Sequence, residues 1–172
     1  MPEDKTYKEA GGAFPEDAGP LEILGMGIYN EVSAYDFYIS VSKKIKNKSG
    51  KEKFEILASD EKRHREILEG LYKKESGKDF DFDPLRVKKI KFEIKDQTGA
   101  FEVIDIAMEA ERQAYLFYTA AAKKTRNPDA QRMFETLAQE EDGHYQRLSA
   151  ERNALSGGFY WFDIEGSGFV EH

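Results

Sequence analysis

The sequence repeats itself at an offset of 80 residues, and this repeat limits the folds that the chain can adopt. The segment 21–70 aligns without a gap on the segment 101–150, and about 16 of 50 positions are identical. Ordinary residue frequencies would give roughly 3 matches by chance. We therefore expect two copies of one supersecondary unit.

Each copy is predicted to be two helices joined by a tight turn, because apolar residues recur at spacings of three and four on both sides of a short breaker. Pro20 suits a first helical position, and Ser49-Gly50-Lys51-Glu52 has the capping-box spacing that would start the second helix. Asn127-Pro128 has the same role in the second copy. Gly77 and the pair Gly157-Gly158 are expected to end the second and fourth helices, which gives four helices of roughly 22 to 28 residues.

A connection of about 20 residues, 78–97, separates the two copies and includes Pro84 and an alternating stretch at Ile90, Phe92 and Ile94. It is too long for a simple hairpin, and a crossover between the two ends of a bundle would explain its length. The sequence thus predicts an all-α four-helix bundle over 20–155, built from two repeated helix pairs. An N-terminal extension (1–19) and an aromatic C-terminal tail (156–172) flank it.

Composition excludes several kinds of site and partner. The chain of 172 residues has a formal net charge of -7, which argues against a nucleic-acid partner because such affinity comes mainly from clustered Lys and Arg. No apolar run approaches the roughly 20 residues of a membrane span, and the N-terminus lacks a signal-peptide pattern. A soluble cytoplasmic protein is expected, without membrane association. With no cysteine, any metal must be bound by oxygen and nitrogen ligands.

Six ionisable residues lie on the predicted inward faces of the four helices. Each continues the spacing of the apolar seam, as Glu61 and His64 do between Leu57 and Leu68. Buried, unpaired carboxylates cost several kcal/mol each, and two divalent cations of about +4 in total would balance four of them. The sequence therefore predicts a two-metal site whose ligands are Glu31, Glu61, His64, Glu111, Glu141 and His144.

The arrangement of these residues favours iron. One Glu from each of two helices, with Glu-x-x-His from each of the other two, is the di-iron carboxylate pattern of helical bundles. Manganese or zinc would also accept oxygen and nitrogen ligands. The alternative, that these polar residues serve packing alone, is disfavoured because both motifs lie on the seam and each follows its partner Glu by the same 30 residues. His172 has no seam around it and is read as unrelated to the site.

Four tyrosines, Tyr35, Tyr38, Tyr115 and Tyr118, are also predicted to face inward. They are interpreted first as core residues, since a bundle core accepts aromatic rings readily. The hydroxyl groups of Tyr38 and Tyr118 are candidates to support the ligand carboxylates by hydrogen bonds.

At these residues the sequence resembles the rubrerythrin branch of the ferritin-like superfamily, over 20–155. The motifs that carry the resemblance are Glu31-x-x-Ala34-x-x-Phe37-Tyr38, Ala58-x-x-Glu61-x-x-His64 and their counterparts that begin at Glu111 and Ala138. The resemblance implies a ferritin-like bundle and a non-haem di-iron centre, with Glu61 and Glu141 as bridging and Glu31 and Glu111 as terminal carboxylates. It also implies reduction of hydrogen peroxide or reaction with oxygen.

Two departures from the family pattern alter what the resemblance implies. Many rubrerythrins have an additional glutamate three residues after the third-helix ligand, where this chain has Ala114. They also commonly end in a rubredoxin domain with four cysteines, so here the electrons are expected from a separate protein. The chain ends instead in an aromatic segment that is expected to pack on the bundle or a partner subunit, or to dock an electron donor.

Three functions remain open from the sequence. The favoured one is an oxidoreductase that reduces peroxide or oxygen, in the context of oxidative stress, and that acts as a homodimer with a separate electron donor. The second is iron handling, in which the same centre oxidises ferrous iron, and this predicts a large shell-like assembly. The third is a non-catalytic, metal-stabilised bundle that acts through its aromatic tail.

Overall fold

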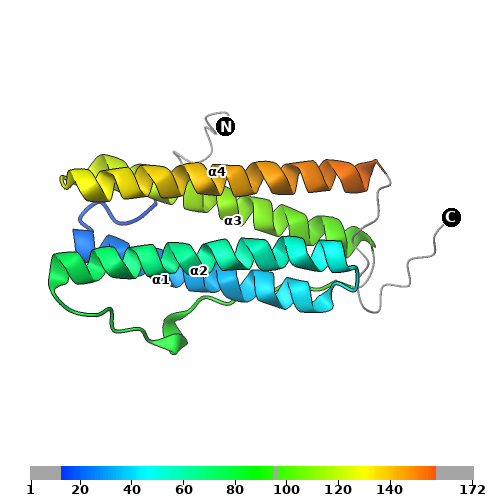
Figure 1. Ribbon diagram of the computed structural model, residues 1–172, viewed down its shortest axis with the longest axis horizontal. Helices are drawn as coiled ribbons and strands as arrows, with labels where there is room; N and C mark the ends of the chain where they lie inside the picture. The colour runs from blue at the N-terminus through cyan, green and yellow to red at the C-terminus, as the bar shows by residue number, and fades with distance from the viewer. Residues whose placement is uncertain (1–12, 95–96, 158–172) are drawn as a thin grey trace.

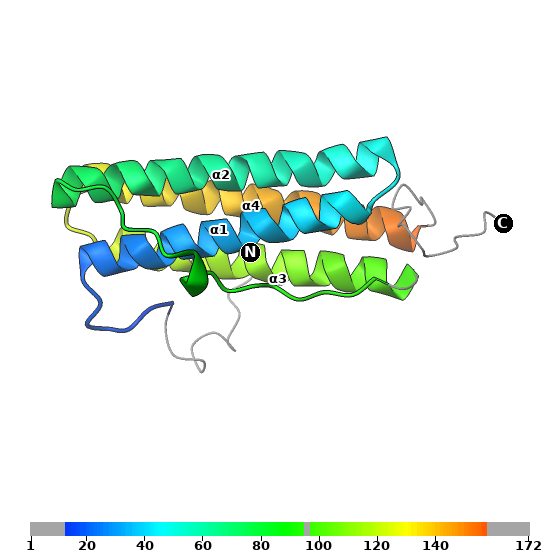
Figure 2. The same cartoon turned by 90° about the horizontal axis from the view of Figure 1, so that it is seen from below.

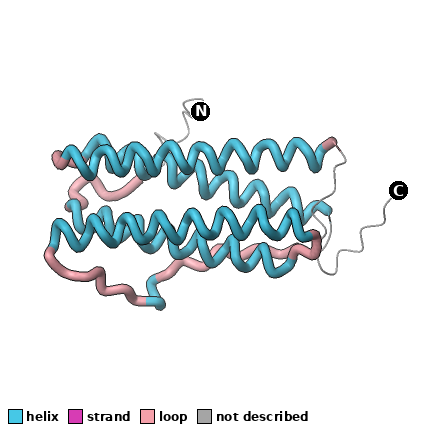
Figure 3. Tube along the Cα trace, in the orientation of Figure 1, coloured by secondary structure: helices cyan, strands magenta, loops and turns pink. Residues whose placement is uncertain are grey.

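Four long helices make up most of the computed structural model, which describes residues 13–94 and 97–157 (Figure 1). They are α1 (Pro20–Lys44), α2 (Lys48–Ser76), α3 (Gln97–Lys124) and α4 (Pro128–Ser156), with a short 3-10 helix, η2 (Pro84–Arg86), between α2 and α3. The described residues contain no strand, as Figure 3 shows. The prediction of an all-α bundle is confirmed, although α2 and α4 are slightly longer than expected, at 29 residues each.

The helices are paired as the repeat predicts. Helix α1 packs closely along α2, and α3 packs closely along α4, whereas the backbone of α1 lies less close to α3 and that of α2 less close to α4. Figures 1 and 2 show the two antiparallel pairs side by side. Each repeat is thus a helical hairpin.

The helices begin and end at the predicted capping residues, with one exception. Pro20 begins α1, Asn127 caps α4 by accepting from the Asp129 and Ala130 amides, and Gly77 ends α2 in a left-handed conformation at φ 74°. Helix α4 ends immediately before Gly157. These predictions are confirmed.

The predicted capping box of the second helix is wrong. Asn47, not Ser49, is the N-cap, and its side chain accepts a hydrogen bond from the Gly50 amide at 3.1 Å. Asn127 is the equivalent residue of the second repeat, so both repeats start their second helix with the same asparagine. An asparagine side chain reaches this amide readily, which leaves Ser49 inside the helix and exposed.

The connection between the hairpins runs the length of the bundle, along α1 towards the start of α3 (Figure 2). Tyr29 of α1 anchors it by ring contacts with Phe80 and Phe82, at centroid distances of 5.6 and 5.5 Å. Further along, the Ser33 hydroxyl donates to the Lys88 carbonyl. The alternating residues Ile90, Phe92 and Ile94 form no strand but pack, partly buried, against the core.

Two apolar clusters fill the bundle, one towards each end. The first contains Val41, Phe54 and Ile104, and the second contains Ile28, Leu68 and Phe134. The segment between them is polar, and the predicted ligands lie there.

No helix in the described part of the chain is long and apolar enough to cross a membrane. The aromatic segment from residue 158 onward, His172 and the first 12 residues of the N-terminal extension lie outside the described residues.

The reassigned cap gives a test of the fold. We expect Asn47→Ala to lower the free energy of unfolding by about 1 kcal/mol, because the Gly50 amide loses its acceptor. Urea denaturation followed by circular dichroism measures this change. Ser49→Ala is the matched control and should leave stability within about 0.5 kcal/mol; a larger loss for Ser49→Ala than for Asn47→Ala would restore the capping box.

Candidate metal centre

All six predicted ligands meet at the centre of the bundle, and all are buried. Glu31 comes from α1, Glu61 and His64 from α2, Glu111 from α3, and Glu141 and His144 from α4. None is more than 3% exposed, and His64 and Glu141 are 0% exposed. The seam spacing thus identified inward-facing residues correctly, and the helix pairing brings them to one level.

The six side chains form two overlapping clusters. One consists of Glu31, Glu61, His64 and Glu141, and the other of Glu61, Glu111, Glu141 and His144; within each, one potential ligand atom per residue lies within 4.8 Å of the others. Glu61 and Glu141 belong to both clusters. The geometry therefore offers two adjacent metal positions that share two carboxylates.

Both histidines point the same ring atom into the site. His64 Nδ1 lies 3.1 Å from Glu141 Oε1 and 3.5 Å from Glu61 Oε2. His144 Nδ1 lies 3.1 Å from both Glu61 Oε1 and Glu141 Oε2. The two rings are nearly parallel, at 18°, with centroids 5.7 Å apart. Each Nδ1 is thereby placed to act as one nitrogen ligand of its cluster.

The donor set fits a pair of divalent cations. Glu61 Oε1 is buried and accepts no well-formed hydrogen bond in the described residues, although His144 Nδ1 lies 3.1 Å away, and a buried carboxylate oxygen that is poorly satisfied is costly. Four carboxylates buried side by side would repel one another. Two divalent cations would coordinate this oxygen and balance the four negative charges.

Without cations, protons must balance part of this charge. Burial and the charge of Glu61 raise the pKa of Glu31 well above its usual range, while burial and the charges of Glu111 and Glu31 raise the pKa of Glu141 to about 8. Burial alone would lower the pKa of His64, but its contacts with surrounding carboxylates raise it to about 11. Near pH 7 the cation-free site therefore carries protons on groups that would be ligands.

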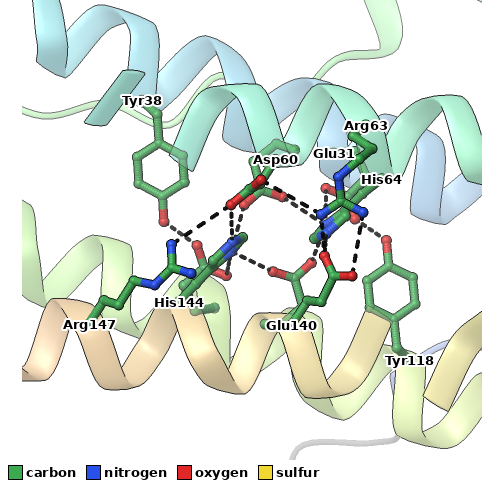
Figure 4. A network of polar contacts seen from close by, with 12 residues as sticks. Glu31, Tyr38, Asp60, Arg63, His64, Tyr118, Glu140, His144 and Arg147 are labelled. Atoms are coloured by element: carbon green, nitrogen blue, oxygen red, sulfur yellow. Dashed lines mark hydrogen bonds and ion pairs between the residues drawn. The ribbon is translucent and has the colours of Figure 1, made fainter. Parts of the chain in front are cut away.

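Tyr38 and Tyr118 support the site from opposite helices (Figure 4). The Tyr38 hydroxyl donates to Glu111, and the Tyr118 hydroxyl donates to Glu31. Burial and the neighbouring carboxylates raise the pKa of both phenols, so the hydroxyls remain donors. Both tyrosines are 1% exposed, whereas Tyr35 and Tyr115, also predicted to face inward, are only partly buried.

Three polar residues outside the seam were missed by the sequence reasoning. Asp60 and Glu140 contact the outward-facing Nε2 atoms of the histidines, and Arg63 binds Glu140. The Arg63 and His64 contacts lower the pKa of Glu140 although burial opposes this, so it remains a carboxylate. The sequence repeat could have indicated Asp60 and Glu140, because an acidic residue precedes the Glu of both Glu-x-x-His motifs.

A cavity of about 280 Å³ opens beside the site on the side of α1 and α3. The carboxylates of Glu31, Glu61 and Glu111 line its inner part, and the exposed residues Lys88 and Gln113 line its outer part. Ala34 and Ala114, equivalent in the two repeats, also line it. Small side chains at both positions leave room for a small molecule next to the carboxylates.

The sequence matches the model of a known protein family over most of its length. The model described as Rubrerythrin matches residues 22–152, which include all six predicted ligands. The chain belongs to the rubrerythrin family. The resemblance noted in the sequence is thereby confirmed.

Solved structures support the same fold. A hypothetical protein from Pyrococcus furiosus is 33% identical with a TM-score of 0.73, over 83% of this chain and 93% of that one. The dodecameric thioferritin of Bacteroides fragilis, a bacterioferritin-related protein, is 19% identical with a TM-score of 0.68, over 82% and 90%. Nigerythrin in a partially reduced state is 18% identical with a TM-score of 0.68, over 87% and 76%. A search of curated proteins gave no significant match.

The raised pKa values predict that metal binding is coupled to proton release. Because a carboxylate or imidazole must lose its proton to bind a cation, we expect zinc binding to release protons at pH 7. Apparent affinity should rise with pH between 6 and 8, as Glu141 loses its proton near pH 8. Calorimetry in buffers of different ionisation enthalpy counts the protons, and binding without proton release would contradict this electrostatic description.

Proposed function

We propose that this protein is a di-iron oxidoreductase that reduces hydrogen peroxide or oxygen with electrons from a separate donor protein. The observation that carries the proposal is the pair of buried clusters that share Glu61 and Glu141, in a chain of the rubrerythrin family. We assign Glu31 and His64 to one iron, Glu111 and His144 to the other, and Glu61 and Glu141 to both. When bound, two ferrous ions supply the two electrons that convert one hydrogen peroxide, with two protons, to two waters.

The protein residues prepare this site in three ways. The two apolar clusters on either side exclude water along the bundle axis. The hydroxyls of Tyr38 and Tyr118 hold the terminal carboxylates in place, with their protons directed at Glu111 and Glu31. The histidines expose Nδ1 to the site because Nε2 is occupied on the outer side.

The cavity lined by Ala34 and Ala114 supports a small substrate. At about 280 Å³ it has room for peroxide or oxygen, and it leads to three of the four carboxylates. We propose it as the route by which the oxidant reaches the site.

Electrons are proposed to come from another protein. The 172 residues contain no cysteine and so provide no cysteine-bound iron that could relay electrons. We also propose that the protein works as a homodimer, although both clusters are completed within one chain.

Iron handling is the second candidate function. It is favoured by the likeness to a dodecameric thioferritin, since the same carboxylates would suit oxidation of ferrous iron as a substrate. The two functions differ in whether iron remains at the site or passes through it.

Anaerobic loading with ferrous iron, followed by addition of peroxide or oxygen in separate samples, distinguishes these functions. We expect about two irons per chain, because there are two clusters. We also expect oxidation to be faster with peroxide than with oxygen. The absorbance of an oxo-bridged ferric pair measures this oxidation. Faster oxidation by oxygen with continued iron uptake would favour iron handling. A tightly held iron that neither oxidant changes would indicate a purely structural metal.

Variants of the shared carboxylates provide the control for that experiment. Glu61→Ala and Glu141→Ala each remove a ligand from both clusters, and we expect either to abolish binding of the iron pair. Glu135→Ala, an exposed residue on α4, should bind iron normally. Full iron binding in both ligand variants would exclude the proposed centre.

The entry route predicts a separate effect. Ala114→Leu should fill part of the cavity and slow oxidation by peroxide about tenfold or more, while iron content stays near that of the wild type. Stopped-flow absorbance on iron-loaded protein measures the rate. Ala120→Leu, on the same helix but outside the cavity lining, is the control; equal rates for the two variants would argue against this route.

A further inference from the structure

We propose that Asp60 and Glu140 are positioning residues that hold the two site histidines across the bundle, each fixing the histidine of the other repeat. The inference rests on the proposed metal centre for its purpose but concerns residues outside the ligand set. It also assigns a role to a pair of equivalent positions in the two hairpins.

The contacts are crossed in both directions. His64 on α2 places Nε2 at 2.7 Å from Glu140 Oε2 on α4. His144 on α4 places Nε2 at 3.0 Å from Asp60 Oδ2 on α2. Figure 4 shows both acidic side chains reaching over the site to the opposite helix.

Helical geometry gives each histidine an acidic neighbour on its own helix as well. Asp60 precedes His64 by four residues, and Glu140 precedes His144 by four, a spacing that permits contact along one helix. The structure pairs neither histidine with that neighbour. Each histidine instead contacts the acidic residue of the other hairpin. This crossed contact occurs twice, at positions that the repeat aligns, so it does not rest on the conformation of a single side chain.

These bonds determine which nitrogen of each ring faces the metals. A carboxylate can only accept, so each histidine donates its Nε2 proton outward. In a neutral ring the Nδ1 lone pair is then free and directed at the shared carboxylates. The outer carboxylates therefore fix both the tautomer and the angle of the rings.

Two arginines limit the charge that the outer carboxylates add. Arg63 Nη2 contacts Glu140 and lies 3.6 Å from Asp60 Oδ1, and Arg147 Nη1 lies 3.9 Å from Asp60 Oδ2. Two cations thus face two anions. The four inner carboxylates remain to be balanced by the metals.

Imidazole nitrogen NMR on zinc-loaded, histidine-labelled protein tests the crossed pairing without redox chemistry. The wild type should show two protected Nε2–H resonances, assigned with His64→Gln and His144→Gln. Glu140→Ala should remove protection of the His64 resonance and leave that of His144; Asp60→Ala should do the reverse. Glu135→Ala should leave both unchanged.

The milder variants Glu140→Gln and Asp60→Asn keep the proposal testable if an alanine variant fails to fold. Each retains an oxygen acceptor, so we expect the same single resonance to shift without losing protection fully. Zinc affinity, measured against a competing chelator, should fall about 10- to 100-fold in each alanine variant. Unchanged affinity would overturn the positioning role.

The crossed pattern and the proposed redox function can fail separately. If Glu140→Ala perturbs His144, or neither variant affects either histidine, the crossed pairing is wrong even in a protein that reduces peroxide. If the pattern appears but the iron-loaded protein is inert to peroxide and oxygen, only the redox proposal fails.

Discussion

Four carboxylates buried at one level of a helical bundle are the constraint on which the rest of this structure depends. In an apolar core they would repel one another and take up protons. The chain lessens this repulsion with hydrogen-bond donors: two imidazoles inside the site and two phenols beside the terminal carboxylates. The charges of the site thus favour the binding of cations, whereas the rest of the interior consists of packed apolar side chains.

Most of the fold and the six inner residues could be predicted from the sequence because both follow from periodicity. A seam at spacings of three and four identifies residues that face inward, and the 80-residue repeat doubles the signal. Asn47 was missed as a cap because the capping-box spacing at Ser49 competed with it, although its equivalence to Asn127 pointed the other way. The N-cap is the residue whose side-chain oxygen reaches a free amide of the first helical turn, here that of Gly50.

Asp60 and Glu140 could not be predicted in the same way. They lie beside the seam and are partly exposed, so periodicity marks them as surface residues. Their contacts depend on how closely α2 and α4 approach, which is a property of the whole bundle. The path of residues 78–94 was also not predictable in detail, because it depends on contacts with α1, such as those of Tyr29 with Phe80 and Phe82, that no sequence spacing indicates.

The crossed contacts give the two hairpins a relation that helix packing alone does not. Within each hairpin the two backbones lie close along their length, whereas the hairpins approach each other less closely and are joined by side chains of the two apolar clusters. Polar side chains also cross between the hairpins: Tyr38 contacts Glu111, Tyr118 contacts Glu31, and the outer carboxylates contact the opposite histidines. The site therefore adds specific polar contacts between the two halves to the apolar packing that already joins them.

The connection over residues 78–94 then has a significance beyond bridging two ends. Since each half contributes one Glu, one Glu-x-x-His pair and partners directed at the other half, two identical hairpins related by a twofold axis would assemble the same centre. Such an assembly would dissociate into separate hairpins on dilution. By tethering the halves, the connection makes their meeting intramolecular, at an effective concentration that dilution cannot lower. Equivalent residues could then diverge, as Arg63 and Gly143 have, which two copies of one hairpin could not do.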